Sequence, residues 1–328
     1  MSDFPHLDRR GLLRGAAFFA LLGATTTGAD ALVSRGLRQL RAGTFGVWNR
    51  IVSGAIGTDI VVSGSSRALN HYDPRVLARA TGLTAFNIGL NGSQTDMQLA
   101  RLRVYLRHNR RPRLLIHNLD LFSLQVSPGE VFDPAQYLPY LDEPALRQAL
   151  LRIDSDAWKW RLPLYGYAVE DLRFTWLKGL AAAAGWQPEE DHAQGFLPQR
   201  RAWSEEFERW RAQAPAGLVV AVQPAGVRAL EDLMRLCQHR AVPLLLVYSP
   251  EYIAAQQQAL NRAAIFERFA ELARRHGATL WDYSDHPLSR DARGFVNSQH
   301  LNAAGAQAFS EALGARLAAW PALRSAQA

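Results

Sequence analysis

The sequence predicts an α/β fold in which helices wind on both sides of a parallel sheet. Two observations predict this class. Short apolar runs bounded by turn residues recur at intervals that leave room for crossover helices, and amphipathic helical patterns fill those intervals. The 328 residues are 48% hydrophobic and 20% charged, so the chain can bury a sizeable core rather than stay disordered. Ligands of such doubly wound folds bind at the carboxyl ends of the strands.

Residues 1–31 are predicted to be an export signal or an N-terminal membrane anchor. Arg9, Arg10 and Arg14 precede the apolar run 15–24 and a small-residue cleavage pattern that ends at Ala31. The arginine pair resembles a twin-arginine signal, although Asp8 stands where that signal has Ser or Thr. The helical pattern continues past residue 31, which keeps an uncleaved anchor open. An export signal and an uncleaved anchor both predict a periplasmic or secreted domain. The anchor would also tether the domain to the inner membrane.

Residues 32–328 are predicted to form the folded domain. Its strands are expected at 59–63, 84–88, 114–118, 243–248 and 279–283, and its clearest helices at 96–107, 226–239, 253–276 and 303–320. From about 122 to 224 the alternation stops, and a mostly helical insertion is expected to cap the strand ends. This insertion holds six of the nine tryptophans. They either form its small core or line a groove for sugar rings or an acyl chain.

Three polar motifs are expected at one edge of the sheet. Gly64-Ser65-Ser66-Arg67 puts a serine at the turn from the first strand into a helix, where backbone N–H groups can stabilise an oxyanion. Residues 87–95 supply glycines and asparagines for close backbone approach and hydrogen-bond donation. Asn297-Ser298-Gln299-His300 precedes the final helix. A serine, a donor loop and a histidine are the parts of a nucleophilic site, whatever their order in the chain.

These motifs resemble the sequence blocks of the SGNH (GDSL-like) hydrolase superfamily. Gly64-Ser65-Ser66 is similar to the G-D-S block, residues 87–92 to the glycine block, and residues 297–300 to the D-x-x-H block. The details look most like the branch that contains the D-alanyl transfer protein of teichoic acid synthesis and the periplasmic polysaccharide O-acetyltransferases. The resemblance implies a three-layer SGNH or flavodoxin-like fold. It also implies an exported esterase or acyltransferase for acyl groups of an envelope or secreted polysaccharide.

Carried onto this chain, the resemblance implies Ser66 as nucleophile and His300 as general base. The backbone N–H groups of Ser66 and Gly92 would form the oxyanion hole. The superfamily adds an asparagine donor from a G-x-N-D block. Here the matching strand end reads His-Asn-Leu-Asp, so Asn118 is the candidate third donor although it is displaced by one position.

Asn297 stands where the superfamily has aspartate, and an amide cannot stabilise an imidazolium as a carboxylate does. Three interpretations stay open. Asp291, Asp282 or Asp285 supplies the carboxylate from the preceding loop. Alternatively, Asn297 orients His300 in a slower Ser–His dyad. In the third interpretation hydrolysis has been lost, and the protein is a catalytically impaired binding or assembly protein of an exopolysaccharide system.

The charge and the motifs of the chain restrict which substrates, partners and cofactors are expected. The chain has 37 Lys+Arg against 30 Asp+Glu, and residues 1–31 carry three of each sign, so the net +7 belongs to the folded domain. An acylated polysaccharide or other acyl ester is the expected substrate, with Arg67 and Asn91 as candidate binding residues, although Arg67 could instead pair with a carboxylate. Membrane-associated polysaccharide machinery is a candidate partner. No nucleic acid is expected for an exported chain. The lone Cys237 and the lack of nucleotide or zinc motifs predict no cofactor and no metal.

Overall fold

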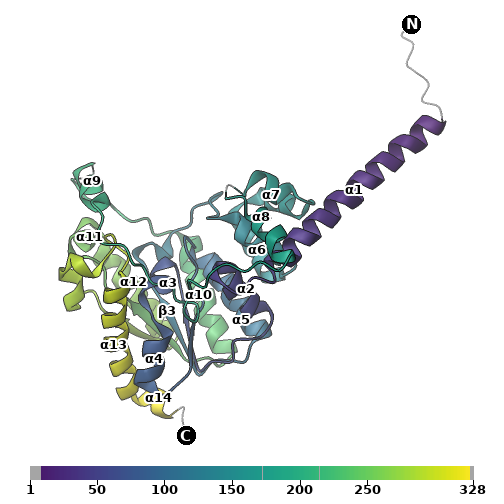
Figure 1. Ribbon diagram of the computed structural model, residues 1–328. Coiled ribbons are helices and arrows are strands. Elements are labelled where there is room, and N and C mark those ends of the chain that lie inside the picture. The colour runs from purple at the N-terminus through teal and green to yellow at the C-terminus, as the bar shows by residue number, and fades with distance from the viewer. Residues whose placement is uncertain (1–8, 172, 214, 326–328) are drawn as a thin grey trace.

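The computed structural model describes residues 9–171, 173–213 and 215–325, with a five-stranded parallel sheet at the centre (Figure 1). The strand order is β2-β1-β3-β4-β5. The strands are β1 (Ile60–Ser63), β2 (Ala85–Asn87), β3 (Leu114–Asn118), β4 (Leu244–Tyr248) and β5 (Thr279–Asp282). Each predicted strand is confirmed, and no end differs from its prediction by more than one residue. The predicted α/β class and the parallel sheet are therefore confirmed.

Helices cover both faces of the sheet and complete a three-layer architecture. The α-helices are α1 (Arg9–Leu37), α2 (Gly43–Val52), α3 (Ser66–His71), α4 (Pro74–Thr81), α5 (Thr95–His108), α6 (Pro144–Ile153), α7 (Tyr165–Val169), α8 (Thr175–Ala183), α9 (Glu206–Gln213), α10 (Pro224–His239), α11 (Ile253–Gln258), α12 (Arg262–Arg275), α13 (Ala303–Ala319) and α14 (Pro321–Ser325). Helices α2, α5, α10 and α12 pack on the face that carries Val61, Leu115 and Leu246. Helices α4 and α13 pack on the face that carries Val62 and Leu245. Burial on both faces explains why the strands read as continuous apolar runs.

The order of the strands fixes where a ligand site can form. After β1 the chain crosses to β2 on one side, whereas after β3 it continues to β4 on the other side. The carboxyl ends of β1 and β3 therefore border a crevice at the point where the winding reverses, which is the usual binding position of doubly wound sheets. The Ser66 motif follows β1 directly.

The predicted helix 253–276 is in fact two helices, α11 and α12, with a break at 259–261. Ala259 forms a bridge with Leu218. The Asn261 side chain accepts from the Val220 N–H at 2.9 Å and donates to the Val220 carbonyl at 2.8 Å. These contacts hold residues 218–220 against the break. A long-range pairing of this kind leaves no periodic signal in the helical sequence itself.

The insertion between β3 and α10 contains α6 to α9 and four short 3-10 segments: η1 (Leu121–Leu124), η2 (Pro134–Gln136), η3 (Leu138–Tyr140) and η4 (Ser155–Arg161). Its tryptophans differ in burial. Trp160 is buried in the core that the insertion shares with α1 and α2, whereas Trp158, Trp186 and Trp210 are exposed.

Helix α1 is long and apolar enough to cross a membrane, judged by length and composition. It projects away from the rest of the fold, and α6, α7 and α8 gather at its base (Figure 1). Asp8 of the predicted twin-arginine motif lies outside the described residues. The last turns of α1 enter the core through Val33 and Leu37.

The stretch 101–113 is rich in arginine, and several of these side chains are bound within the fold rather than solvated. Arg101 is 2% exposed, and its guanidinium lies 4.6 Å from the ring centroid of Trp48. Burial lowers the pKa of Arg101 to about 10. Arg107 and Arg110 pair with Glu143 and Asp59. Much of this charge run therefore contributes to packing and ion pairs within the fold.

Candidate active site

Ser66, His300 and Asn297 lie in one chain of hydrogen bonds. The Ser66 Oγ atom is 2.7 Å from His300 Nε2, and His300 Nδ1 is 3.0 Å from Asn297 Oδ1. Ser66 is the first residue of α3, directly after the β1 turn, and His300 lies in the loop before α13. The fold thus joins residues 234 positions apart in the sequence.

The surroundings of Asn297 fix the protonation pattern of His300. Asn297 Oδ1 also accepts the backbone N–H groups of Gln299, at 3.1 Å, and of His300, at 2.9 Å. Two backbone donors leave only one amide orientation, with the oxygen toward the imidazole. His300 Nδ1 must therefore carry the proton, and Nε2 is left as an acceptor for the Ser66 hydroxyl. This is the tautomer that a general base needs.

The environment of His300 favours its neutral form. Burial lowers the pKa of His300 to about 4, and the positive charges of Arg67 and Arg201 act in the same direction. A carboxylate on Nδ1 would oppose this shift, but the position is held by an uncharged amide. His300 is therefore a neutral acceptor over most of the pH range. The uncharged amide also stabilises a protonated His300 less than a carboxylate would.

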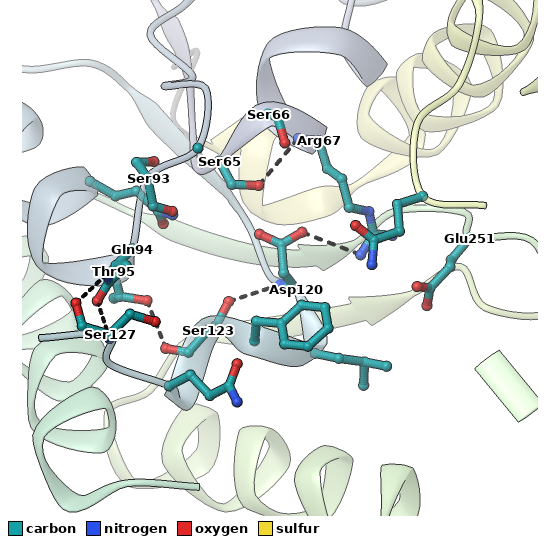
Figure 2. Close-up of a pocket in the computed structure, with 16 residues that line it drawn as sticks. Ser65, Ser66, Arg67, Ser93, Gln94, Thr95, Asp120, Ser123, Ser127 and Glu251 are labelled. Atoms are coloured by element: carbon teal, nitrogen blue, oxygen red, sulfur yellow. Dashed lines mark hydrogen bonds and ion pairs between the residues drawn. The ribbon is translucent and has the colours of Figure 1, made fainter. Parts of the chain in front are cut away.

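Two tight turns bring the backbone of Ser66 and Gly92 to the same cavity. The turn after β1 is tied to the loop after β2 because the Leu90 N–H donates to the Gly64 carbonyl at 2.9 Å. Gly92 has φ +60°, and a Cβ atom there would lie 2.2 Å from the Phe132 ring. Both conditions require glycine. Ser66 and Gly92 line a cavity of about 190 Å³ (Figure 2).

Asn118 lies elsewhere than the predicted oxyanion-hole position. Its amide group donates to the Leu119 carbonyl at 3.0 Å and to Asp120 Oδ1 at 3.1 Å, and its oxygen accepts from the Tyr72 hydroxyl at 2.7 Å. Alternation along β3 puts Asn118 on the same face as Ile116, toward α13. Neither amide hydrogen is available to an oxyanion in this arrangement, and Asp120 is the residue that faces the cavity.

Arg67 is 3% exposed and bonds mainly to the protein around it. Its guanidinium donates to the carbonyls of Ser249 and Pro250 after β4 and lies 3.3 Å from Asp120 Oδ1 after β3. Burial opposes its charge, but Tyr248, Asp120 and Glu251 raise the pKa of Arg67 above its ordinary value. Arg67 therefore ties the helix of Ser66 to two strand ends, which is the carboxylate-pairing alternative rather than a free substrate contact.

His71 belongs to this assembly although the sequence did not single it out. It is fully buried on α3, and its Nε2 accepts the backbone N–H of Leu301 at 3.0 Å. Its Nδ1 therefore carries the proton and donates to Ser249 Oγ at 2.8 Å. Burial holds the pKa of His71 well below its usual range, with Arg67 and His300 acting in the same direction. A histidine five positions after the serine was the one signal available.

The remaining predicted site residues lie apart from the Ser66 cavity. Asn91 lines a different cavity, bounded by Phe132 and residues of α8. Asp291 pairs with Arg293 at 2.8 Å, and Asp282 accepts the Ser284 N–H at 2.8 Å. Since Asn297 occupies His300 Nδ1, the arrangement leaves no position there for a carboxylate from residues 282–291.

The wall of the Ser66 cavity is rich in hydroxyl and amide groups (Figure 2). The polar residues are Ser65, Ser66, Ser93, Gln94, Thr95, Gln98, Ser123, Gln125, Ser127 and Gln299, with Asp120 and Glu251 as the carboxyl groups and Arg67 as the cation. Gln98 is 3% exposed, and its Oε1 has no partner among the described residues. Burial raises the pKa of both Asp120 and Glu251, and the charge of Arg67 opposes this.

An apolar cavity of about 320 Å³ adjoins the polar one. The two share Leu121, Phe122, Glu251 and Gln299 as common wall residues. The apolar side comes largely from the insertion, where Phe207 and Trp210 of α9 are stacked with ring centroids 5.9 Å apart. A substrate with a polar and an apolar part can therefore contact both chambers at once.

One group of possible metal ligands occurs among the described residues. Glu190, Asp191 and His192 have ligand atoms within 4.8 Å of one another. His192 Nδ1 is already hydrogen-bonded to Asp191 at 2.6 Å. Asp191 and His192 border the cavity that contains Asn91 rather than the one that contains Ser66.

Comparisons with known proteins give distant likenesses. No family model matches the chain, and no curated protein matches it. Among solved structures, the chain is similar to one from Desulfitobacterium hafniense DCB-2 named for the G-D-S-L lipolytic family, with TM-score 0.38 and 11% identity over 78% of this chain and 97% of that one. It is also similar to a Streptococcus pneumoniae structure named for platelet activating factor, with TM-score 0.41 and 13% identity over 91% of this chain and 97% of that one.

Proposed function

We propose that this chain is an exported serine esterase or acyltransferase acting on ester-linked acyl groups of an envelope or secreted polysaccharide. The observation that carries the proposal is the hydrogen-bonded series Ser66–His300–Asn297, with separations of 2.7 Å and 3.0 Å. Serine becomes a useful nucleophile when an oriented neutral imidazole accepts its proton. The second of the three sequence interpretations, a Ser–His dyad with Asn297 as orienter, fits these separations.

The proposed reaction has two half-steps. Ser66 Oγ attacks the ester carbonyl while its proton passes to His300 Nε2, and the backbone N–H groups of Ser66 and Gly92 stabilise the oxyanion. His300 then gives the proton to the departing sugar oxygen, and the acyl group remains on Ser66. Water or a second sugar hydroxyl then attacks the acyl-Ser66 ester while His300 accepts its proton, and His300 returns that proton to the departing Ser66 Oγ. Hydrolysis and transfer differ only in this last acceptor.

The polar cavity supports a substrate that carries hydroxyl groups. A buried acceptor without a partner, such as Gln98 Oε1, is costly unless a ligand or water donates to it. The many serine and glutamine side chains nearby can hydrogen-bond a sugar ring in several directions. The resemblance of the motifs to the envelope-acylating branch of the SGNH superfamily supports the same substrate class.

The N-terminal helix supports an exported and membrane-tethered location. The apolar segment of α1 follows three arginines, Arg9, Arg10 and Arg14, as expected when the start of a spanning helix stays in the cytoplasm. The folded domain would then act in the periplasm, close to membrane-associated polysaccharide machinery.

The test is turnover of 4-nitrophenyl acetate by the purified full chain, with Ser66→Ala and His300→Ala variants. We expect both variants to lose activity, and mass spectrometry of a quenched reaction to detect an acetyl group on Ser66. Acceptor oligosaccharides added to the assay distinguish transfer from hydrolysis by the appearance of acetylated sugar. Activity that survives both substitutions contradicts the proposal. A wild-type chain that binds oligosaccharide but never acylates Ser66 would be the binding or assembly protein instead.

A further inference from the structure

The insertion carries an exposed apolar patch beside the base of α1. Six large apolar side chains on η4, α7 and α8 and the turns beside them are between 36% and 62% exposed. We call these six residues the insertion patch: Trp158, Leu162, Val169, Phe174, Leu177 and Leu180. Phe174, Leu177 and Leu180 follow one another at intervals of three residues, from the N-cap of α8 along the helix, and form one stripe. Thr175, Gly179 and Ala182 of the same helix are buried. Exposed apolar side chains gathered on one part of a fold are typical of protein or membrane contact sites.

The contacts between the insertion and α1 fix the level of the patch along the helix. Asp30 Oδ1 accepts the backbone N–H of Leu164 at 3.0 Å, and Ser34 Oγ lies 3.2 Å from the Tyr167 hydroxyl. Farther along, the backbones of Gly36 and Gly179 approach so closely that a Cβ on Gly36 would lie 1.8 Å from the Gly179 carbonyl oxygen. The insertion therefore meets α1 from residue 30 onward.

The free part of α1 ends at that level. Residues 12–29 rise roughly 27 Å at 1.5 Å per residue, close to the thickness of a bilayer core. Phe18, Phe19 and Leu21 in this part are more than 60% exposed. A bilayer that covers this segment would have its boundary near Asp30, where the insertion first contacts the helix and α7 and α8 lie beside its base (Figure 1).

Charged side chains of both signs lie among the patch residues, and the acidic Asp154, Glu170 and Asp171 accept hydrogen bonds within the insertion. The only two lysines of the chain, Lys159 and Lys178, lie among the patch residues, together with Arg161 and Arg173. Lys159 pairs with Asp156 and Arg173 with Asp133. Among the described contacts no ion pair engages Arg161 or Lys178. Exposed tryptophan and basic side chains around an apolar surface are the usual composition of a protein face at the membrane boundary.

We infer that the insertion patch rests in the interface of the bilayer that α1 enters, with anionic phospholipid headgroups as its partner. The patch and α1 then form one continuous membrane-contacting surface, because the Gly36–Gly179 crossing holds them together. The inference rests on the proposed membrane tether, concerns how the domain sits on the membrane, and is independent of the reaction at Ser66.

Spin labels on the full chain test the inference in vesicles of phosphatidylcholine with phosphatidylglycerol. Labels are introduced by Leu177→Cys in the patch, Leu21→Cys in α1 and Leu260→Cys, which is 64% exposed in the loop between α11 and α12. The buried Cys237 gives little background, and unsubstituted protein measures it. The measurement is the ratio of collisions with oxygen, which dissolves in lipid, to collisions with a water-soluble nickel complex.

We expect the ratio at position 177 to lie severalfold above that at position 260, and below that at position 21. The inference is overturned, but the tether is not, if the collision ratio at position 177 equals that at position 260 while position 21 is in lipid. An aqueous position 21 overturns it as well, since the patch would have no bilayer to contact. Dipolar broadening between copies at position 177 overturns it in favour of a second copy of the chain.

A charge variant separates headgroup contact from simple apolar contact. Arg161→Glu combined with Lys178→Glu is expected to lower the ratio at position 177 severalfold in anionic vesicles. Purely phosphatidylcholine vesicles should show a much smaller change. An equal change in both lipids contradicts the proposed anionic partner, and unchanged tryptophan fluorescence confirms that the variant is folded.

Discussion

Asn297 orients the histidine of this site, a role that a charged aspartate fills in serine proteases. In a serine protease, replacing the triad aspartate by asparagine costs roughly 10⁴ in kcat because the histidine takes the wrong tautomer. Here two backbone N–H groups fix the amide so that its oxygen faces His300. The tautomer is already correct, and only the charge is missing.

Asn297→Asp is therefore expected to raise kcat by about tenfold, the difference between a neutral and a charged hydrogen bond to the imidazolium. The new carboxylate should also raise the pKa of His300, which is about 4 in the present chain. Since the base must be neutral to act, the rising limb of kcat/KM against pH moves to higher pH. Profiles of 4-nitrophenyl acetate hydrolysis measure both effects. Gln257→Glu adds the same charge on an exposed side chain and should change neither; an unshifted limb in the Asn297→Asp variant would contradict the assignment.

His71 is a positioning residue because it holds the backbone next to His300. His71→Ala removes the acceptor of the Leu301 N–H. A small displacement of His300 should lower kcat roughly ten- to a hundredfold with little change in KM. His71→Gln retains an acceptor and should recover part of the loss. The control His117→Gln alters another fully buried histidine, on β3, whose Nδ1 lies 3.4 Å from Ser63 Oγ. Equal loss of kcat in both His71 variants and the control would indicate a general folding effect.

The site residues that belong to local sequence motifs could be predicted. Ser66 and His300 stand next to strand and helix boundaries, so their meeting followed from the fold class. Asn118 could not be assigned in the same way, because a displacement of one residue along β3 turns a side chain to the opposite face. The structure gives the cavity position to Asp120 instead. His71 needed knowledge of which loop it would touch.

At the scale of elements, strands and short-range helices were the predictable part. Continuous apolar runs marked all five strands because helices bury both of their faces. The break between α11 and α12 was missed because its cause, the bonds of Asn261 to Val220, joins residues 41 positions apart. The burial of Arg101 could not be predicted because its ring partner, Trp48, is distant in sequence.

The crossing of α1 and α8 is the element contact most sensitive to a single methyl group. Gly36→Ala would force a Cβ to 1.8 Å from the Gly179 carbonyl oxygen. We expect a loss of about 1–3 kcal/mol in the free energy of unfolding from overpacking. Gly28→Ala, on the same helix, meets nothing within 4 Å and should be neutral or slightly stabilising. Chemical denaturation in detergent micelles compares the two, and equal stabilities would contradict the close crossing.

At the scale of the whole molecule, buried histidines make the fold sensitive to acid. Burial lowers the pKa of His117 to about 4, against 6.5 for the ordinary side chain. Between these values the unfolded chain binds a proton that the folded chain does not, so stability falls as pH decreases from about 6.5 to about 4. The loss from His117 alone is of order 3 kcal/mol and is complete below the folded-state pKa.

Urea denaturation at pH 7 and pH 4.5 measures this loss. His117→Leu removes one of the titrating groups and should reduce the difference between the two pH values by roughly 2–3 kcal/mol, while the buried His71 and His300 retain their share. His239→Leu, at an exposed position at the end of α10, serves as the matched control and should keep the full difference. A His117 variant as acid-sensitive as the unsubstituted chain would show that other groups dominate.

The unbroken course of α1 has a mechanical consequence. The helix runs continuously from Arg9 to Leu37, and its last turns are core residues, so the described helix contains no joint between tether and domain. If α1 spans the membrane as proposed, a domain held in this way would stay at a fixed height above the bilayer. Polymer strands that emerge from the same bilayer would meet the mouth of the Ser66 cavity at a fixed distance from their origin.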